Sequence, residues 1–134
     1  MTSAAWDIQK AIYAALASAV APVVVYDNVP QNAAFPYVTI GEDTAIQWDT
    51  MPDGSGKGHG QEATLTIHTW SRYAGRKETK ELQGSIYTAL HNQSLSMDDH
   101  TMALLQFEYA DSFMDDDGRT RHGVQRFRML VTAD

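Results

Sequence analysis

The sequence predicts an α+β fold: a mainly antiparallel sheet of about five strands with two helices packed on it. Two segments carry apolar residues at helical spacing, and five others are β-branched runs or alternate at period two. Their order along the chain is α-β-β-β-α-β-β. With 134 residues, 43% of them apolar, the chain is long enough to bury one core, so we expect a single domain over residues 1–134.

The first helix is expected to end near Val20. Its apolar residues recur at helical spacing: Ile8, Ile12, Ala15, Leu16 and Ala19. Ser3 is the expected N-cap, and Asp7 stands in the first turn, where a negative charge suits the helix dipole. Pro22 cannot donate a helical hydrogen bond and disfavours helix at the preceding residue, so the helix stops there.

Three strands are expected next, at 23–26, 36–48 and 62–71. In the third, Leu65, Ile67 and Thr69 alternate with Thr64, Thr66, His68 and Trp70. The segment 49–60 contains four glycines and one proline with almost no apolar side chain. Such a segment buries too little surface to offset the entropy of ordering it, so we expect a loop that becomes ordered on a partner.

The second helix is expected from Gly75 or Arg76 to about His91. Its apolar stripe comprises Leu82, Ile86, Ala89 and Leu90. Lys77 and Glu81 stand one turn apart and can form an ion pair on its solvent-facing side. Gly84 costs about 1 kcal/mol relative to alanine within a helix, which predicts a close approach to another backbone.

The last two strands, expected at 102–113 and 122–132, form a hairpin. Their apolar sets are Leu105, Phe107 and Tyr109, and Phe127, Met129 and Val131. If both sets face the core, the numbers of paired residues add to an even number, so the loop between the strands contains an odd number of residues. The simplest such loop is the three-residue segment 116–118, with Gly118 in the left-handed conformation. Four cross-strand pairs follow: Phe107 with Phe127, Leu105 with Met129, Glu108 with Arg126, and Asp115 with Arg119. The other face is polar, with mixed charge.

Composition excludes several classes of protein. There is no cysteine, which excludes disulfide scaffolds, thiolate metal sites and cysteine catalysis. Ten basic residues stand against 17 acidic ones, a net charge of −7, which argues against a surface that neutralises phosphates or binds an anionic membrane. No stretch reaches the roughly 20 apolar residues of a membrane helix. We expect the chain to act in the cytoplasm or within an assembled particle.

Three motifs that suggest chemistry fail on their own requirements. The segment 54–58 lacks the spacing of a phosphate-binding loop, and no helix follows it. The segment 115–118 lacks the closing glutamate of a calcium loop and is a turn with unpaired acid groups, although weak cation binding remains open. No histidine pair has the metalloprotease spacing. We therefore expect no catalytic residue, no cofactor and no metal. A hidden enzyme site would require a ligand-filled pocket enclosing two of His68, Trp70, His122 and Glu62.

Several stretches, in the right order along nearly the whole chain, resemble one family. They are Tyr26-Asp27, Val29-Pro30, Phe35-Pro36-Tyr37-Val38, Ile40-Gly41, Leu65, Ile67-His68, Trp70-Ser71, Ile86-Tyr87, Ala89-Leu90-His91 and the run from Asp117 to Gly123. The family is that of the tail-completion or tail-terminator proteins of long-tailed phages and phage-like gene transfer agents. Its fold, a small sheet flanked by helices, agrees with the fold expected from the residues alone.

The resemblance implies a structural protein without catalytic residues. Family members form a ring, typically a hexamer, that caps the head-proximal end of the tail tube and stops its growth. The ring docks the head-completion (stopper) protein, and DNA passes through its lumen without specific binding. We expect the same partners and place here, with assembly in the bacterial cytoplasm and no membrane contact. A net charge of −7 per subunit suits a lumen that repels phosphate.

The expected interfaces are the segments 48–60 and 111–122. Their candidate residues are Trp48, Asp49, Met51, Asp53, Lys57 and His59, and Asp115, Asp116, Asp117, Arg119 and Arg121. Three alternatives stay open. The first is another head–tail connector component, such as an adaptor, a stopper or a minor tail protein. The second is a small enzyme, and the third is a nucleic-acid binder. The last would use the arginines at 119, 121, 126 and 128.

Overall fold

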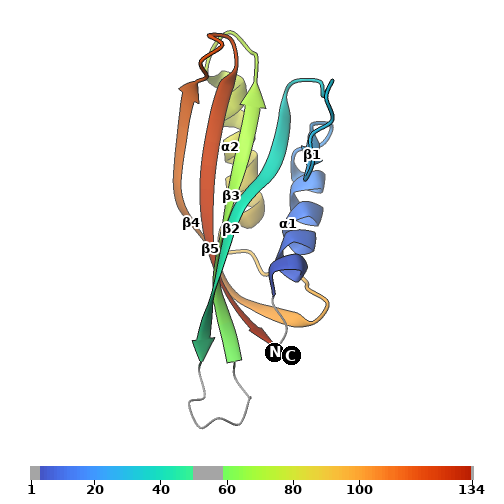
Figure 1. Ribbon diagram of the computed structural model, residues 1–134, viewed down its shortest axis with the longest axis vertical. Helices are drawn as coiled ribbons and strands as arrows, with labels where there is room; N and C mark the ends of the chain where they lie inside the picture. The colour runs from blue at the N-terminus through green and yellow to red at the C-terminus, as the bar shows by residue number, and fades with distance from the viewer. Residues whose placement is uncertain (1–3, 50–58, 134) are drawn as a thin grey trace.

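Two helices lie against one face of a five-stranded sheet in the computed structural model, which describes residues 4–49 and 59–133 (Figure 1). The elements are α1 (Ala5–Ala19), β1 (Val24–Tyr26), β2 (Tyr37–Asp49), β3 (His59–Ser71), α2 (Lys77–Leu90), β4 (His100–Met114) and β5 (Arg121–Ala133). The fold class and the order of elements are confirmed. β3 and β5 begin earlier than expected, and β4 is longer at both ends.

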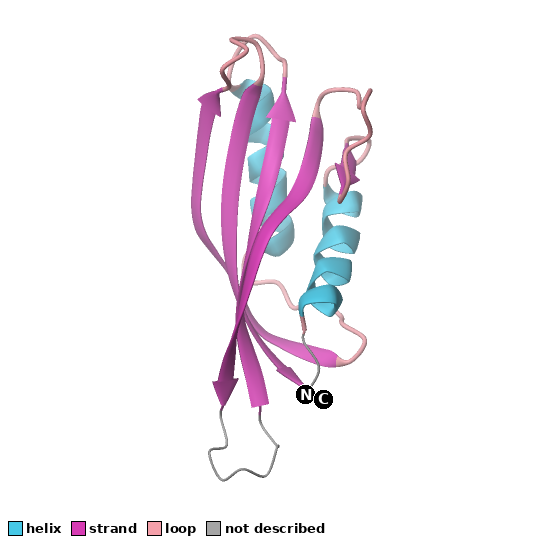
Figure 2. Cartoon of the chain, viewed as in Figure 1, coloured by secondary structure: helices cyan, strands magenta, loops and turns pink. Residues whose placement is uncertain are grey.

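The sheet has the strand order β1-β2-β3-β5-β4. β1 runs parallel to β2, and the other neighbouring strands are antiparallel. The two edges therefore differ: β1 spans 3 residues and β4 spans 15. β2 and β3 extend past the helices at the lower end of the molecule (Figure 2).

The core lies between the helices and one face of the sheet. Ile8, Ile12 and Leu16 of α1 are buried there, as the helical spacing predicts. α2 contributes Leu82, Ile86 and Leu90, with Ala89 partly buried beside them. The predicted alternation in β3 is confirmed, because Leu65, Ile67 and Thr69 are buried while their neighbours face the other side. Lys77 and Glu81 form the expected pair at 3.9 Å.

The start of α1 differs from the expectation. Ser3 lies outside the described residues, and Ala4 occupies the N-cap position without a side-chain cap. Asp7 stands in the first turn as expected, but it is buried. Its carboxylate accepts hydrogen bonds from the backbone N–H groups of Asp98 (3.2 Å) and Asp99 (2.9 Å) and lies 2.9 Å from His100 Nδ1. Asp7 therefore fastens α1 to the start of β4.

The prediction that Gly84 allows a close backbone approach is wrong. Gly84 is exposed, and nothing lies within 4 Å of the position where a Cβ would stand. The close approach to α2 occurs at Gly123 of β5 instead, where a Cβ would lie 2.7 Å from Gln83 Nε2. The helix sequence could not indicate this, because the requirement comes from a strand distant in sequence.

The β4–β5 hairpin keeps the predicted register only in its middle. Phe107 pairs with Phe127 as expected, but an irregularity between 107 and 109 shifts the pairing, so that Tyr109 pairs with Arg126. The extra residue turns Tyr109 away from the core, where it was predicted, and leaves it 47% exposed. Glu108 no longer stands opposite Arg126, yet its carboxylate still lies 3.2 Å from Arg126 Nε.

The turn of this hairpin is longer than predicted. It spans 115–120, closed by a 2.8 Å hydrogen bond from Asp115 N to Thr120 O, so the predicted Asp115–Arg119 pair does not form. The shift at the irregularity forces this, because the expected loop required one constant register. Gly118 has the predicted left-handed conformation, with φ +70°.

Candidate functional site

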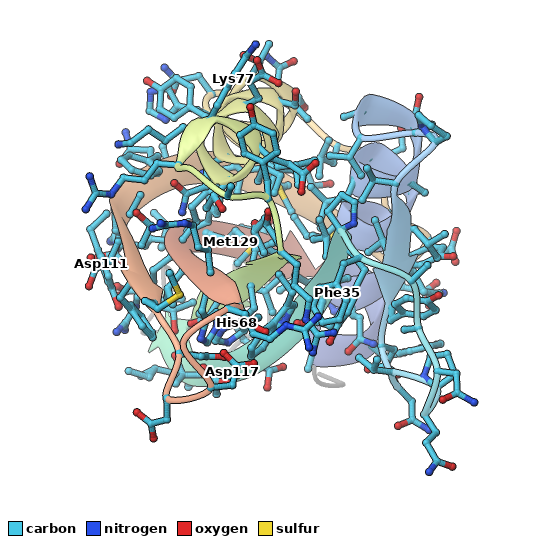
Figure 3. The ribbon with its side chains drawn as sticks, turned by 90° about the horizontal axis from the view of Figure 1, so that it is seen from above. Phe35, His68, Lys77, Asp111, Asp117 and Met129 are labelled. Carbon is cyan, nitrogen blue, oxygen red and sulfur yellow. The ribbon has the colours of Figure 1, made fainter. Side chains whose placement is uncertain are left out.

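The helix-free face of the sheet carries the side chains that alternate with the core residues. Its middle is charged: Arg126 pairs with Glu108, and Arg128 pairs with Glu62 at 2.7 Å. The end of the face nearest the β4–β5 turn is aromatic instead. Figure 3 shows His68 and Phe35 on the side of the sheet away from Lys77 of α2. No helix among the described residues covers this end.

An aromatic row crosses the sheet at that end: Phe35, Tyr37, Trp70, His122 and Phe113. The strand registers place Tyr37, Trp70, His122 and Phe113 directly opposite one another on β2, β3, β5 and β4. Trp70 stacks on His122 with ring centroids 3.8 Å apart and on Tyr37 at 6.2 Å. Arg72 Cζ lies 4.1 Å from the ring centroid of Phe35. Each aromatic pair stabilises the row by about 0.5–1.5 kcal/mol beyond its buried area.

A histidine chain lies beside the row: Glu42, His68, His122 and Asp115. His68 Nε2 lies 3.1 Å from Glu42 Oε1, and His68 Nδ1 lies 2.6 Å from His122 Nε2. At the far end, His122 Nδ1 lies 3.7 Å from Asp115 Oδ1. The chain joins β2, β3, β5 and the β4–β5 turn, elements that are remote in sequence.

Two backbone features position His68. A Cβ at Gly41 would lie 2.5 Å from His68 Cδ2, so only glycine leaves room for the imidazole ring. The β2–β3 register shifts between Ile40 and Asp43, and Glu42 lies within this irregular stretch. An irregularity of this kind re-aims side chains in a sheet. Here it lets the Glu42 carboxylate reach the ring across the strand.

Both ends of the histidine chain are carboxylates, Glu42 beside His68 and Asp115 beside His122. An ionised Glu42 only accepts hydrogen bonds, so a neutral His68 carries its proton on Nε2. In that form His68 Nδ1 accepts from the Nε2–H of a neutral His122, and the unprotonated Nδ1 of His122 faces Asp115, so two neutral rings supply a donor to only one of the two carboxylates. Burial of His122 lowers its pKa from the usual value, and the nearby charge of a protonated His68 lowers it further. Protonation of both rings would place two N–H donors against each other across the 2.6 Å contact between His68 Nδ1 and His122 Nε2.

A hollow of about 430 Å³ opens over the histidine chain and the row. Its lining residues are Asp27, Val29, Tyr37, Thr39, Ile40, Gly41, Glu42, His68, Trp70 and His122. The structure thus brings together His68, Trp70 and His122, three of the residues named for a hidden enzyme site, while Glu62 is not among those that line the hollow. The only hydroxyl of an aliphatic side chain in this lining, Thr39 Oγ1, accepts a 3.1 Å hydrogen bond from Trp70 Nε1.

The chemistry of the hollow favours binding over reaction. Its lining residues include the aromatic side chains of Tyr37 and Trp70 and the carboxylates of Asp27 and Glu42. No lysine or arginine is among the residues that line it. Aromatic faces together with carboxylates attract cations. Within residues 4–49 and 59–133, no group of three or more histidine, aspartate or glutamate side chains is arranged to hold a metal ion.

The predicted interface residues lie at opposite ends of the sheet. Met51, Asp53 and Lys57 lie outside the described residues. Trp48 and Asp49 end β2 and pair with β3 at Gly60 and His59 (lower end of Figure 1). The other predicted segment forms the β4–β5 turn at the upper end. The structure therefore does not join the two segments into one surface.

The acid groups of the turn are not all unpaired, contrary to the expectation. The Asp117 carboxylate accepts hydrogen bonds from Arg119 N (2.9 Å), Thr120 N (2.8 Å) and Thr120 Oγ1 (2.6 Å). These bonds lower the pKa of Asp117 to about 2. Asp115 faces His122. Asp117 thus shapes the turn, and Asp115 belongs to the histidine chain.

The sequence of this protein matches one known family along almost its whole length. The family model for tail completion protein gp17 matches residues 5–132. The chain belongs to the tail completion protein gp17 family. Tail completion protein gp17 of Bacillus phage SPP1 is 25% identical over 107 residues, which cover 80% of this chain and 75% of that protein. The sequence-based recognition is confirmed.

A solved structure shares the fold. A chain of the virion of a native gene transfer agent particle superposes with a TM-score of 0.83 at 22% identity, covering 99% of this chain and all of that one. The tail completion family consists of structural virion proteins and not of enzymes. Among the described residues, neither helix is long and apolar enough to cross a membrane.

Proposed function

We propose that this protein forms a ring, typically a hexamer, on the head-proximal end of a tail tube, where it stops tube growth and docks the head-completion protein. The match to the tail completion family over residues 5–132 carries the proposal. The protein would be assembled in the bacterial cytoplasm and would then be part of the particle tail. The other head–tail connector roles (adaptor, stopper, minor tail protein) are the competing outcomes of the test below.

The two edges of the sheet support assembly with neighbours. Edge strands present unpaired backbone groups that adjoining chains can cover. β4 is a 15-residue edge, and it bears the exposed apolar side chains of Tyr109, Phe113 and Met114. The opposite edge, β1, exposes Val24. Because the two edges differ, contact between them is head-to-tail, which generates a ring when the rotation closes.

The charge of the chain supports passage of DNA. Six copies with a net charge of −7 each would surround the lumen with a field that repels phosphate. DNA would then slide through without sticking, because the 17 acidic residues of each subunit outnumber its 10 basic ones. Binding that fell steeply with added salt would favour the nucleic-acid binder instead.

The test is to polymerise purified tail-tube subunits with and without this protein. A terminator shortens the tubes in proportion to its concentration and adds a ring at one end only, seen by negative-stain microscopy. Tubes of unchanged length would contradict the proposal. Binding to the head connector without binding to tubes would assign the chain to the adaptor or stopper class.

The predicted interface segments enter the same assay as variants. Deletion of residues 53–58 is expected to abolish capping if the glycine-rich segment contacts the tube. Asp116→Asn in the β4–β5 turn is the milder test of the second segment, since Asp116 accepts none of the described hydrogen bonds that shape the turn. Unchanged capping by either variant removes that segment from the interface.

A further inference from the structure

We infer that the hollow over the histidine chain receives cationic side chains from the start of α2 in the adjacent subunit. This inference rests on the proposed ring. It assigns the two surfaces that meet between subunits. They are the acidic hollow, with Asp27 and Glu42 among its lining residues, and a basic corner formed by Arg76, Lys80 and Arg121.

The hollow is suited to a guanidinium or an ammonium group. Glu42 has 76% of its side chain exposed, and its only described side-chain partner is His68, so its oxygens retain acceptor capacity. Trp70 and Tyr37 line the hollow together with the carboxylates, and one face of Trp70 is already stacked on His122. The same aromatic row already holds one guanidinium within the chain, that of Arg72 over Phe35. Cation–π contact and ion pairing act together at such a site.

The basic corner has no ion-pair partner among the described residues, although Arg121 Nη2 donates a 3.5 Å hydrogen bond to the backbone carbonyl of Ala74. Arg76 and Lys80 stand one turn apart at the start of α2, and Arg121 lies beside Arg76 in a smaller hollow. None of the three lies within 4 Å of a carboxylate among residues 4–49 and 59–133. Positive charge at a helix N-terminus is unfavourable, because the helix dipole is also positive there. A negatively charged neighbour would relieve this repulsion.

The placement of the two surfaces favours a second copy as the occupant. Both lie at the upper end of Figure 1, where β3 ends and α2 begins. They are on opposite sides of the sheet, as Lys77 and His68 are in Figure 3. The hollow lies toward the β1–β2 side, and the corner adjoins Phe113 and Met114 of the β4 edge. Copies placed side by side in a ring therefore bring the corner of one toward the hollow of the next.

Thiol cross-linking tests this contact, because the chain contains no cysteine. Glu42→Cys and Lys80→Cys are made separately and together, and the concentrated proteins are oxidised. We expect a ladder of covalent oligomers from the double variant and heterodimers from mixed single variants. Each single variant alone should give at least about fivefold less dimer, because a head-to-tail contact does not place a residue opposite itself.

The matched control pairs Asp98→Cys with Lys80→Cys. The Asp98 side chain is 74% exposed, close to the value for Glu42, but lies away from the hollow. Charge exchange provides a second readout: Glu42→Lys and Lys80→Glu should each weaken self-association by about fivefold, and combining them should restore it.

Three results would overturn the inference. An equal ladder from the control pair would mean non-specific collision. Oligomers seen by light scattering without the ladder would place the subunit contact elsewhere while leaving the ring intact. A chain that stays monomeric in both measurements would exclude this contact, and the tube-capping assay then decides separately whether the proposed function stands.

Discussion

The Asp7–His100 pair and the histidine chain both join carboxylates to imidazoles, but in opposite surroundings. Asp7 and His100 have side chains only 8% and 4% exposed. In the histidine chain, the rings of His68 and His122 are sheltered, while the terminal carboxylates of Glu42 and Asp115 are 76% and 31% exposed. The first pair is enclosed by the fold, and the second opens onto the helix-free face.

The difference shows how burial and hydrogen-bond completeness separate a structural contact from a surface available to a partner. Asp7 receives two backbone N–H groups as well as His100, so the fold uses its acceptor capacity. Glu42 receives only His68 among the described residues. We expect changes at Asp7 to affect stability and changes at Glu42 to affect assembly.

The largest effect is expected from Asp7→Ala. The change leaves the buried His100 and the part-buried N–H groups of Asp98 and Asp99 without their acceptor, which costs about 3 kcal/mol of the free energy of unfolding. Urea denaturation followed by circular dichroism measures it. Asp98→Ala is the control, because it removes only an exposed pair with Lys10 and should cost less than about 1 kcal/mol. Equal losses in both variants would contradict the structural role of Asp7.

The loss of stability at low pH provides a second test of the structural role of Asp7. Asp7 has a pKa lowered to about 2, chiefly by His100 and the backbone N–H of Asp99. The unfolded chain therefore binds this proton first as pH falls, and stability present above about pH 4 is lost toward pH 2. The loss should be about 2 kcal/mol. Asp7→Asn should show a shallower decline, and an unchanged pH profile would refute this assignment.

Two glycines offer the next comparison. Gly41→Ala places a methyl group against the His68 ring and should cost about 1–2 kcal/mol, since overpacked sites relax poorly. Gly84→Ala meets open space on α2 and should stabilise the protein by up to about 1 kcal/mol. Thermal unfolding of both variants distinguishes the close approach from the open helix face. A destabilising Gly84→Ala would show an unseen contact there.

The smallest effect concerns His122. Because its pKa is lowered in the folded state, the unfolded chain binds more protons just below the usual histidine pKa. Stability should therefore fall slightly as pH drops below about 6.5. His122→Gln should flatten this slope, as measured by urea midpoints between pH 7.5 and about 5.5. A variant with the full slope would show that another group titrates.

Most of the fold could be predicted from local patterns. Helical spacing gave α1 and α2, and period-two alternation gave the core face of β3, because each pattern depends on neighbouring residues alone. Register in the last hairpin was predicted only as far as Phe107. The irregularity beside Glu108 follows from packing that no spacing in the strand indicates, so Tyr109 was placed on the wrong face.

The candidate site was within reach of the sequence only in part. His68, Trp70 and His122 could be named together as chemistry-bearing residues, but not as neighbours, since nothing local places β5 between β3 and β4. Glu42 was missed because its approach to His68 depends on an irregular strand. Asp7 was read as a helix-dipole residue because its partners lie more than 90 positions away.

The sequence by itself determined the composition-level exclusions, the element order and the family, because these depend on residue content and on patterns read along the chain. Only the tertiary structure decided that the rings of His68 and His122 contact each other and that the carboxylate of Asp7 is buried. It also placed the acidic hollow and the basic corner on opposite sides of the same end of the sheet. These features depend on contacts between strands and helices remote in sequence, and such contacts are set by packing of the whole sheet.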